Sequence, residues 1–184
     1  SVYVARLDLV LSDTSKFSID DSSDCTPLLE KKVCDAVNHL QRHGVLSGSL
    51  AKSLKPLGSS LPRLYGLPKT HKPDFPTRPI LSMCSSPTYE LAKWLCNVLQ
   101  PIRDSVCQNI VKDSFSFVDS ISNLSLSDRV MVSFDVQSLF TNVPLRETTQ
   151  FIKNIISDFN LDLPCSCDLL VDLILLCTEG VQFL

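Results

Sequence analysis

The chain has 184 residues, of which 44% are hydrophobic and 20% are charged, and its formal net charge is −3. This composition excludes an intrinsically disordered polypeptide, because there are enough apolar side chains to build a core. The negative balance also excludes nucleic-acid binding driven by overall charge, so any such function must reside in a local cationic patch.

Residues 1–56 form a predicted N-terminal helical segment. An apolar start is followed by a polar loop, and a helix then opens with proline at its first helical position, Thr26-Pro27. Its apolar residues recur at helical spacing on one face: Leu29, Val33, Val37 and Leu40. Gly44 ends this helix, and a further short helical turn is expected near residues 48–54.

Residues 56–82, PLGSSLPRLYGLPKTHKPDFPTRPILS, hold six of the 11 prolines in the chain. A segment with so many prolines cannot be helical, so extended strands joined by rigid turns are predicted. Its charged residues are four cations and one acid, a local charge of +3: Arg63, Lys69, Lys72 and Arg78 against Asp74. A stiff cationic arm suits a polyphosphate or nucleic-acid backbone, and Tyr65 could stack on a base. The alternatives are a solvated surface hairpin and a packed tyrosine.

The following segment is predicted to contain two helices. Ser86-Pro87 opens the first of them, and Pro101 should kink it. Asp113 is the expected N-cap of the second, which runs through Leu124.

The strongest strand pattern in the chain is Arg129 to Phe134, in which Val130, Val132 and Phe134 share one face. Two helices are expected after it. Asn142 caps the first, which begins at Pro144. The last helix, Leu169 to Cys177, is followed by VQFL, the expected start of another strand.

Asp135 ends the predicted central strand and is followed by a short turn and a capped helix. A carboxylate in this position is a common Mg²⁺ ligand in phosphoryl transfer, although turn and cap residues also occur there. Two-metal chemistry needs at least a second acid on a neighbouring strand. Every other acid falls on a predicted helix or loop, so the sequence predicts only half of such a site.

The eight cysteines are scattered, and no signal peptide is recognised, so we expect an intracellular protein with reduced, mostly buried thiols. Cys165 and Cys167 are close in sequence, but no histidine lies nearby, which favours core or loop cysteines over a zinc site. No apolar run reaches the roughly 18 residues that a membrane-spanning helix needs, so no membrane partner is expected.

Four blocks of the sequence follow one another in a distinctive order: RLYGLPKTHKP (Arg63–Pro73), RPILS (Arg78–Ser82), SPTYELAKWL (Ser86–Leu95) and SFDVQSLFTNVP (Ser133–Pro144). In this order and spacing they resemble the reverse transcriptase domain of Penelope-like retroelements, a family related to telomerase reverse transcriptases. The resemblance covers most of the chain, including SDTSKF (Ser12–Phe17). Other retroelement classes fit the LYGLPK and SLFTNVP blocks less well.

The resemblance implies an α+β fold with the fingers and partial palm of a right-hand polymerase, truncated before the second catalytic strand. Residues 57–184 would be this partial domain, with fingers at about 57–125 and the first half of the palm at about 126–184. In the family, a glycine-containing block, a strand with adjacent aspartates and a thumb come next, followed in many members by a GIY-YIG endonuclease. None of these is found here, so we expect an N-terminal fragment.

The resemblance also implies residue roles. Asp135 matches the first catalytic metal-binding aspartate, and Val136 would lend a backbone carbonyl to one Mg²⁺. Arg78 matches the arginine that grips the incoming triphosphate, with either Lys69 or Lys72 as its companion. Phe140 matches the bulky residue that excludes the ribose 2′-OH, with a core phenylalanine as the alternative. Arg63 and Tyr65 are the candidate nucleic-acid contacts.

By this resemblance, the full-length parent would be an RNA-directed DNA polymerase acting in the nucleus. It would extend a DNA primer on an RNA template with deoxynucleoside triphosphates through two Mg²⁺ ions. The fragment itself is expected to be inactive and to bind Mg²⁺ weakly, because one aspartate cannot hold both metals. The alternatives are a non-catalytic nucleic-acid-binding remnant and a degenerate open reading frame.

Overall fold

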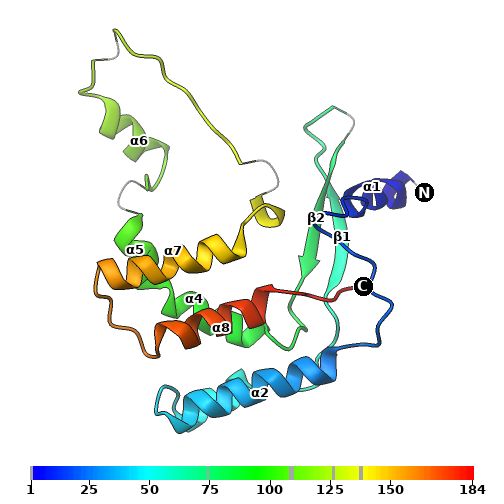
Figure 1. Cartoon of the computed structure of the whole chain (residues 1–184). Helices are drawn as coiled ribbons and strands as arrows, with labels where there is room; N and C mark the ends of the chain where they lie inside the picture. The colour runs from blue at the N-terminus through cyan, green and yellow to red at the C-terminus, as the bar shows by residue number, and fades with distance from the viewer. Residues whose placement is uncertain (1, 74, 108–109, 126, 137–138) are drawn as a thin grey trace. The chain divides into compact units, whose positions relative to one another are not determined.

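The computed structural model describes residues 2–73, 75–107, 110–125, 127–136 and 139–184 (Figure 1). These residues form eight α-helices, one 3₁₀ turn and one two-stranded antiparallel sheet, which confirms the α+β class. The chain divides into two compact units, which are considered separately below: unit 1 is Ser1–Val98 with Asp162–Leu184, and unit 2 is Leu99–Leu161. None of the helices in the described ranges is long and apolar enough to cross a membrane.

Unit 1 has a helical core beside a β-hairpin. Its described helices are α1 (Val2–Leu11), α2 (Thr26–Arg42), α3 (Gly48–Leu54), α4 (Tyr89–Val98) and α8 (Cys167–Thr178). α4 contacts both α3 and α8, and α3 also contacts α2. The core side chains come from α2, α3, α4 and α8, and the largest fully buried ones are Leu40, Leu91, Leu170, Leu173, Val33 and Val37.

α2 confirms the helix predicted from sequence. Pro27 lies in its first turn, where a missing N–H costs nothing because that group has no intrahelical partner. The backbone N–H of Thr26 donates to Asp24 Oδ1 at 2.8 Å. The helix ends at Arg42, and Gly44 follows with φ at 75°, a left-handed conformation that glycine adopts without strain. The short helix expected near residues 48–54 is α3.

The proline-rich segment forms the predicted extended strands, which pair as a hairpin. Strands β1 (Arg63–Pro68) and β2 (Thr77–Ser82) pair antiparallel, with Arg63 opposite Ser82 and Leu67 opposite Arg78. α1 contacts both strands. Extended strands joined by a turn are what this density of proline allows, since a helix is excluded.

The outer edge of β1 is covered by the two ends of the chain. Leu64 N donates to Leu184 O at 2.7 Å, and Leu184 N donates to Pro62 O at 2.9 Å. Gly66 N donates to Tyr3 Oη at 2.8 Å, while Pro68 has no N–H to offer. The strand expected to start at VQFL is not formed, because residues 181–184 have no regular secondary structure. Leu184 nevertheless hydrogen-bonds to β1 and so covers part of an edge that could otherwise pair with another chain.

Unit 2 contains α5 (Gln100–Val106), α6 (Ser114–Ile121), the 3₁₀ turn η1 (Leu139–Thr141) and α7 (Leu145–Asp158). α5 contacts α7, and each helix buries an isoleucine, Ile102 and Ile155 respectively. Asp113 is the predicted cap of α6: its Oδ1 accepts from Ser116 N at 2.8 Å.

Several predicted helix boundaries in the second half of the chain are corrected. α4 begins at Tyr89, after a turn at Ser86-Pro87. Pro101 does not kink one helix but separates two, because α4 ends at Val98 and α5 begins at Gln100. A proline ring clashes with the carbonyl four residues earlier, so a fresh helix start places it where no clash arises.

α6 ends at Ile121 instead of Leu124. The N-cap of α7 is Pro144, not Asn142, whose backbone N–H instead donates to Leu139 O within the 3₁₀ turn.

The strand predicted at Arg129 to Phe134 is wrong. Residues 129–136 have no regular secondary structure, and Val130 and Phe134 are 86% and 91% exposed. An alternating pattern makes a strand only when a neighbour supplies hydrogen bonds and an apolar face, and the described part of unit 2 contains no strand to act as that neighbour.

Candidate functional site

The strand register places three predicted site residues on one face of the hairpin. Residues directly opposite in an antiparallel pair point to the same side, and residues two apart on one strand do so as well. Because Tyr65 is opposite Ile80 and Leu67 is opposite Arg78, the side chains of Arg63, Tyr65 and Arg78 share one face. We call Arg63, Tyr65, Leu67, Arg78 and Ile80 the cationic hairpin face. Both arginines are exposed, as is 42% of Tyr65.

The opposite face of the hairpin is held by α1. A Cβ added to Gly66 would overlap Thr77 Cγ2 and would lie 3.1 Å from Leu7 Cδ2 of α1, so a larger residue here would have to displace both side chains. Arg6 Nη1 also donates to Phe75 O at 2.9 Å, near the hairpin turn. These contacts occupy the Gly66 side and leave the cationic hairpin face open.

The two candidate lysines lie in the turn between the strands. Lys69 N donates to Pro76 O at 2.9 Å, and Lys72 N donates to Lys69 O at 3.1 Å, so backbone bonds hold the turn closed. Lys69 is half-buried and Lys72 is exposed. Asp74, the acid expected to oppose these cations, lies outside the described residues.

The ion pairs between described residues do not involve the hairpin cations. They join Lys16 to Asp13, Lys93 to Glu90 and Arg103 to Asp104. All three are local, between residues one to three positions apart. The cationic hairpin face therefore keeps its charge available, as far as the described residues show.

Asp135 has a different setting. It is exposed in the irregular segment 129–136 of unit 2, and Val136 beside it is 60% exposed. Phe140 lies in η1, but its side chain is outside the described part of the structure. Among the described residues, no three His, Cys, Asp or Glu side chains gather where they could hold a metal ion. The predicted half-site thus has no second half in the described ranges.

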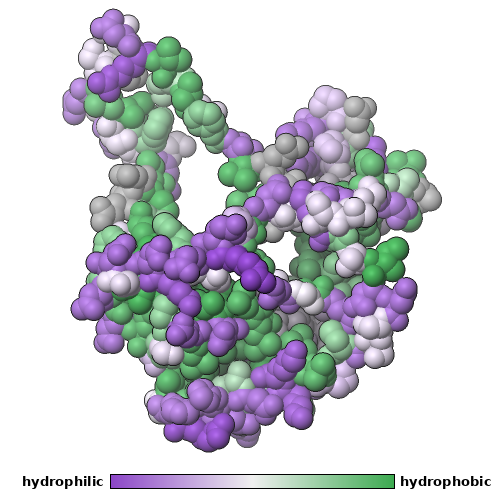
Figure 2. All heavy atoms as spheres, in the orientation of Figure 1, coloured by the Kyte–Doolittle hydropathy of each residue, from purple (hydrophilic) through white to green (hydrophobic). Residues whose placement is uncertain are grey.

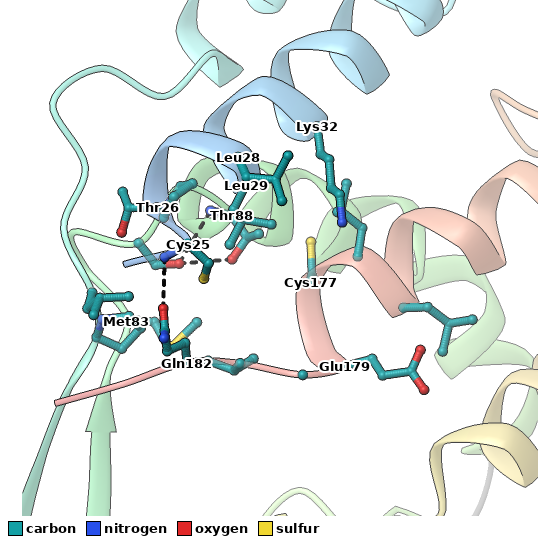
Figure 3. Close-up of a pocket in the computed structure, with 18 of the residues that line it drawn as sticks. Cys25, Thr26, Leu28, Leu29, Lys32, Met83, Thr88, Cys177, Glu179 and Gln182 are labelled. Carbon is teal, nitrogen blue, oxygen red and sulfur yellow. Dashed lines mark hydrogen bonds between the residues drawn. The ribbon is translucent and has the colours of Figure 1, made fainter. Parts of the chain in front are cut away.

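Unit 1 also has a cavity of about 440 Å³ that the sequence did not predict (Figure 3). Its lining comes from α2, α8, the turn before α4, the residues before β1 and the C-terminal segment, and most of it is apolar, including Leu28, Leu29 and Leu175. Two buried hydroxyls, Ser86 Oγ and Thr88 Oγ1, lie 3.1 Å apart at its wall. Neutral hydroxyls on an apolar wall can orient a bound molecule but supply no charge for catalysis.

Gln182 anchors the C-terminal segment beside this cavity. Its Oε1 accepts from Cys25 N at 2.9 Å, and its Nε2 donates to Asp20 Oδ2 at 3.2 Å (Figure 3 shows the bond to Cys25). The pKa of Asp20 is lowered, first by its hydrogen bonds with Ser22 and then by Gln182. No local pattern marks Gln182, because its partner at Cys25 is 157 positions away in the sequence.

Cys177 lines the same cavity as a buried thiol. Burial, and then the nearby Cys96, raises the pKa of its thiol to about 12, so it stays protonated at neutral pH. The expectation of mostly buried thiols is wrong, however. Cys84 and Cys96 are exposed, Cys177 is buried, and the other cysteines are intermediate.

No protein-family model, curated protein or solved structure matches this chain. The case for a function therefore depends on the four sequence blocks and on the geometry of the hairpin.

Proposed function

We propose that this chain carries the fingers hairpin and first palm segment of an RNA-directed DNA polymerase similar to those of Penelope-like retroelements. In the longer parent, acting in the nucleus, the hairpin would contact the incoming deoxynucleoside triphosphate and the RNA template paired with its DNA primer. The observation that carries the proposal is the register of β1 and β2, which gives Arg63, Tyr65 and Arg78 one exposed face.

This face has the chemistry that such ligands require. A guanidinium group donates two parallel hydrogen bonds to phosphate oxygens, and it does so without losing its charge at any physiological pH. The ring of Tyr65 offers an apolar surface on which a base can stack, and stacking tolerates any base. A lysine from the turn, Lys69 or Lys72, adds a further positive charge at the end of the hairpin.

The metal part of the proposal rests on Asp135. Its carboxylate and the Val136 carbonyl are hard oxygen donors of the kind that Mg²⁺ prefers, and both residues are exposed. Mg²⁺ would supply charge neutralisation at the phosphates. With a single acid, the chain would hold the ion weakly and would not polymerise DNA.

A non-catalytic nucleic-acid-binding remnant is the second candidate. It is favoured by the exposed setting of Asp135, which has no cluster of metal-binding side chains around it in the described ranges. In that case the hairpin would bind nucleic acid and Asp135 would have no metal.

The binding test compares two double variants in fluorescence anisotropy with a labelled RNA–DNA hybrid. Arg63→Ala with Arg78→Ala should weaken binding about tenfold near 50 mM salt and reduce the salt slope by about two, since two phosphate contacts are lost. Lys31→Ala with Lys52→Ala removes the same net charge from exposed helical positions and should change affinity little. Absence of binding at low salt, or equal losses in both double variants, would reject the hairpin as the interface.

Primer extension tests whether the chain is an active polymerase, which neither the inactive polymerase fragment nor the non-catalytic remnant would be. We expect no Mg²⁺-dependent product on a poly(rA)/oligo(dT) template, and clear extension would contradict the inactive fragment. Mg²⁺ titration followed through the amide signals of Asp135 and Val136 then distinguishes weak metal binding from the metal-free remnant.

A further inference from the structure

The segment Arg129–Asp135, RVMVSFD, is the most exposed apolar stretch of unit 2 that the structure describes. Val130, Val132 and Phe134 are 86%, 69% and 91% exposed, and Met131 between them is 61% exposed. These side chains are thus open to solvent, and the described part of unit 2 contains no strand with which the segment could pair. Figure 2 shows hydrophobic residues along this stretch. An apolar, β-branched run of this kind is a template for pairing with another chain.

The sequence of this segment is complementary to itself when two copies run antiparallel. With Val132 opposite Val132 of a second copy, Arg129 is opposite Asp135 and Val130 is opposite Phe134, by simple counting along the sequence. Two-fold symmetry repeats both pairs, so each end of the paired strands carries one cation and one carboxylate. An aromatic residue opposite a β-branched one and opposite charges across a pair each stabilise antiparallel strands.

The same register also separates most apolar side chains from the polar ones, on opposite faces of the paired strands. Val130, Val132 and Phe134 of both copies lie on one side of the paired strands, which gives a continuous apolar face of six side chains. Arg129, Ser133 and Asp135 of both copies lie on the other side, together with Met131. A parallel in-register pair would instead put arginine opposite arginine and aspartate opposite aspartate, and a slip of one residue would mix the faces.

We propose that Arg129–Asp135 pairs antiparallel with the same segment of a second copy of this chain, forming a two-fold symmetric dimer. The interface is isologous, so each copy satisfies one strand edge of the other. Two strands alone are marginally stable, so the dimer is weak and dissociates on dilution. This proposal does not rest on the polymerase assignment, because it uses only the exposure and the order of these seven residues.

Sedimentation equilibrium from about 1 μM to 1 mM covers the interval in which such a weak pair associates. The unmodified chain should pass from monomer to dimer across this range. Arg129→Asp alone and Asp135→Arg alone each turn both charge pairs into like-charge pairs, and each should weaken association about tenfold or more. Asp119→Arg, at an exposed position on α6, makes the same charge change as Asp135→Arg outside the segment and should leave the dimer unchanged.

The decisive experiment mixes the two single variants. In the mixed pair, the carboxylate introduced by Arg129→Asp in one copy would face the guanidinium introduced by Asp135→Arg in the other. The remaining native Asp135 of the first copy would face the native Arg129 of the second, so heterodimers should form as readily as dimers of the unmodified chain.

A chain that stays monomeric at the highest concentration overturns the proposal. Larger assemblies that ignore the charge changes, or a mixture that remains as weak as its components, also overturn it. Circular dichroism of each variant, expected to be unchanged because both positions are exposed, excludes unfolding as the cause.

Discussion

Residues 56–82 and residues 129–134 are both predicted to contain strands, yet only the first of these regions forms them. The hairpin segments Arg63–Pro68 and Thr77–Ser82 pair with each other, and α1 and Leu184 add hydrogen bonds to the edge of β1. Residues 129–136 alternate more regularly but remain irregular and exposed. The hairpin strands form because each has a neighbouring strand to pair with, and not because their residues have a higher β-strand propensity.

The comparison shows what each region needs. In the hairpin, a turn only eight residues long, from Lys69 to Pro76, brings both strands together, so the partner is local in sequence. Residues 129–136 have no such partner within reach of a short turn in the described part of the chain: α6 precedes them and η1 follows. A strand pattern without a partner leaves its backbone groups to water and its apolar side chains exposed.

The largest expected effect on stability comes from changing the size of one side chain in each region. Gly66→Val forces a side chain into the space between Thr77 and Leu7, and overpacking of this kind should lower the free energy of unfolding by about 1–3 kcal/mol. The opposite exchange, Val132→Gly, removes an exposed side chain and should change the free energy of unfolding by about 0.5 kcal/mol or less. Urea unfolding at low protein concentration, where the chain is monomeric, measures both. Equal effects would show that residues 129–136 are packed.

Hydrogen exchange should distinguish the regions without any mutation. The amide protons of Leu64, Gly66 and Lys69 have hydrogen-bond acceptors, whereas residues 129–136 belong to no ladder. At low protein concentration we expect exchange about tenfold slower in the first group than in the segment 129–136. Protection that appears in this segment as concentration rises would support the dimer, and protection at every concentration would contradict the irregular segment.

The smallest effect concerns one hydrogen bond at the β1 edge. Tyr3→Phe removes the acceptor of the Gly66 N–H and should cost about 1 kcal/mol of stability, together with faster exchange of the Gly66 amide. Tyr89→Phe on α4 keeps its ring beside Lys93 and serves as the matched control. If the two variants behave alike, α1 does not hold the hairpin through this bond.

Much of the local structure could be predicted from the sequence. Thr26-Pro27 and Gly44 marked the ends of α2, Asp113 marked the start of α6, and the prolines of residues 56–82 excluded a helix in favour of strands. These signals depend on the backbone chemistry of one or a few adjacent residues, which acts in the same way whatever the rest of the chain does.

The candidate site was predictable only in part. The cations of the hairpin were evident as a local charge, but the shared face of Arg63, Tyr65 and Arg78 follows from the pairing register. The cavity lined by α2 and α8, and the bonds of Gln182 to Cys25 and Asp20, join residues far apart in sequence. No local pattern signals such contacts, because they form only when the helices pack.

The sequence by itself determined where α2 and α6 begin, where prolines forbid helices and where positive charge gathers. Tertiary structure alone decided which strand patterns became strands, because a strand is stabilised by groups on a neighbouring segment and not by its own residues. It joined Leu64 to Leu184 and Gly66 to Tyr3, and it left the apolar side chains of residues 130–134 in solvent. Predicted strands therefore became a paired hairpin in one region and an unpaired segment in the other.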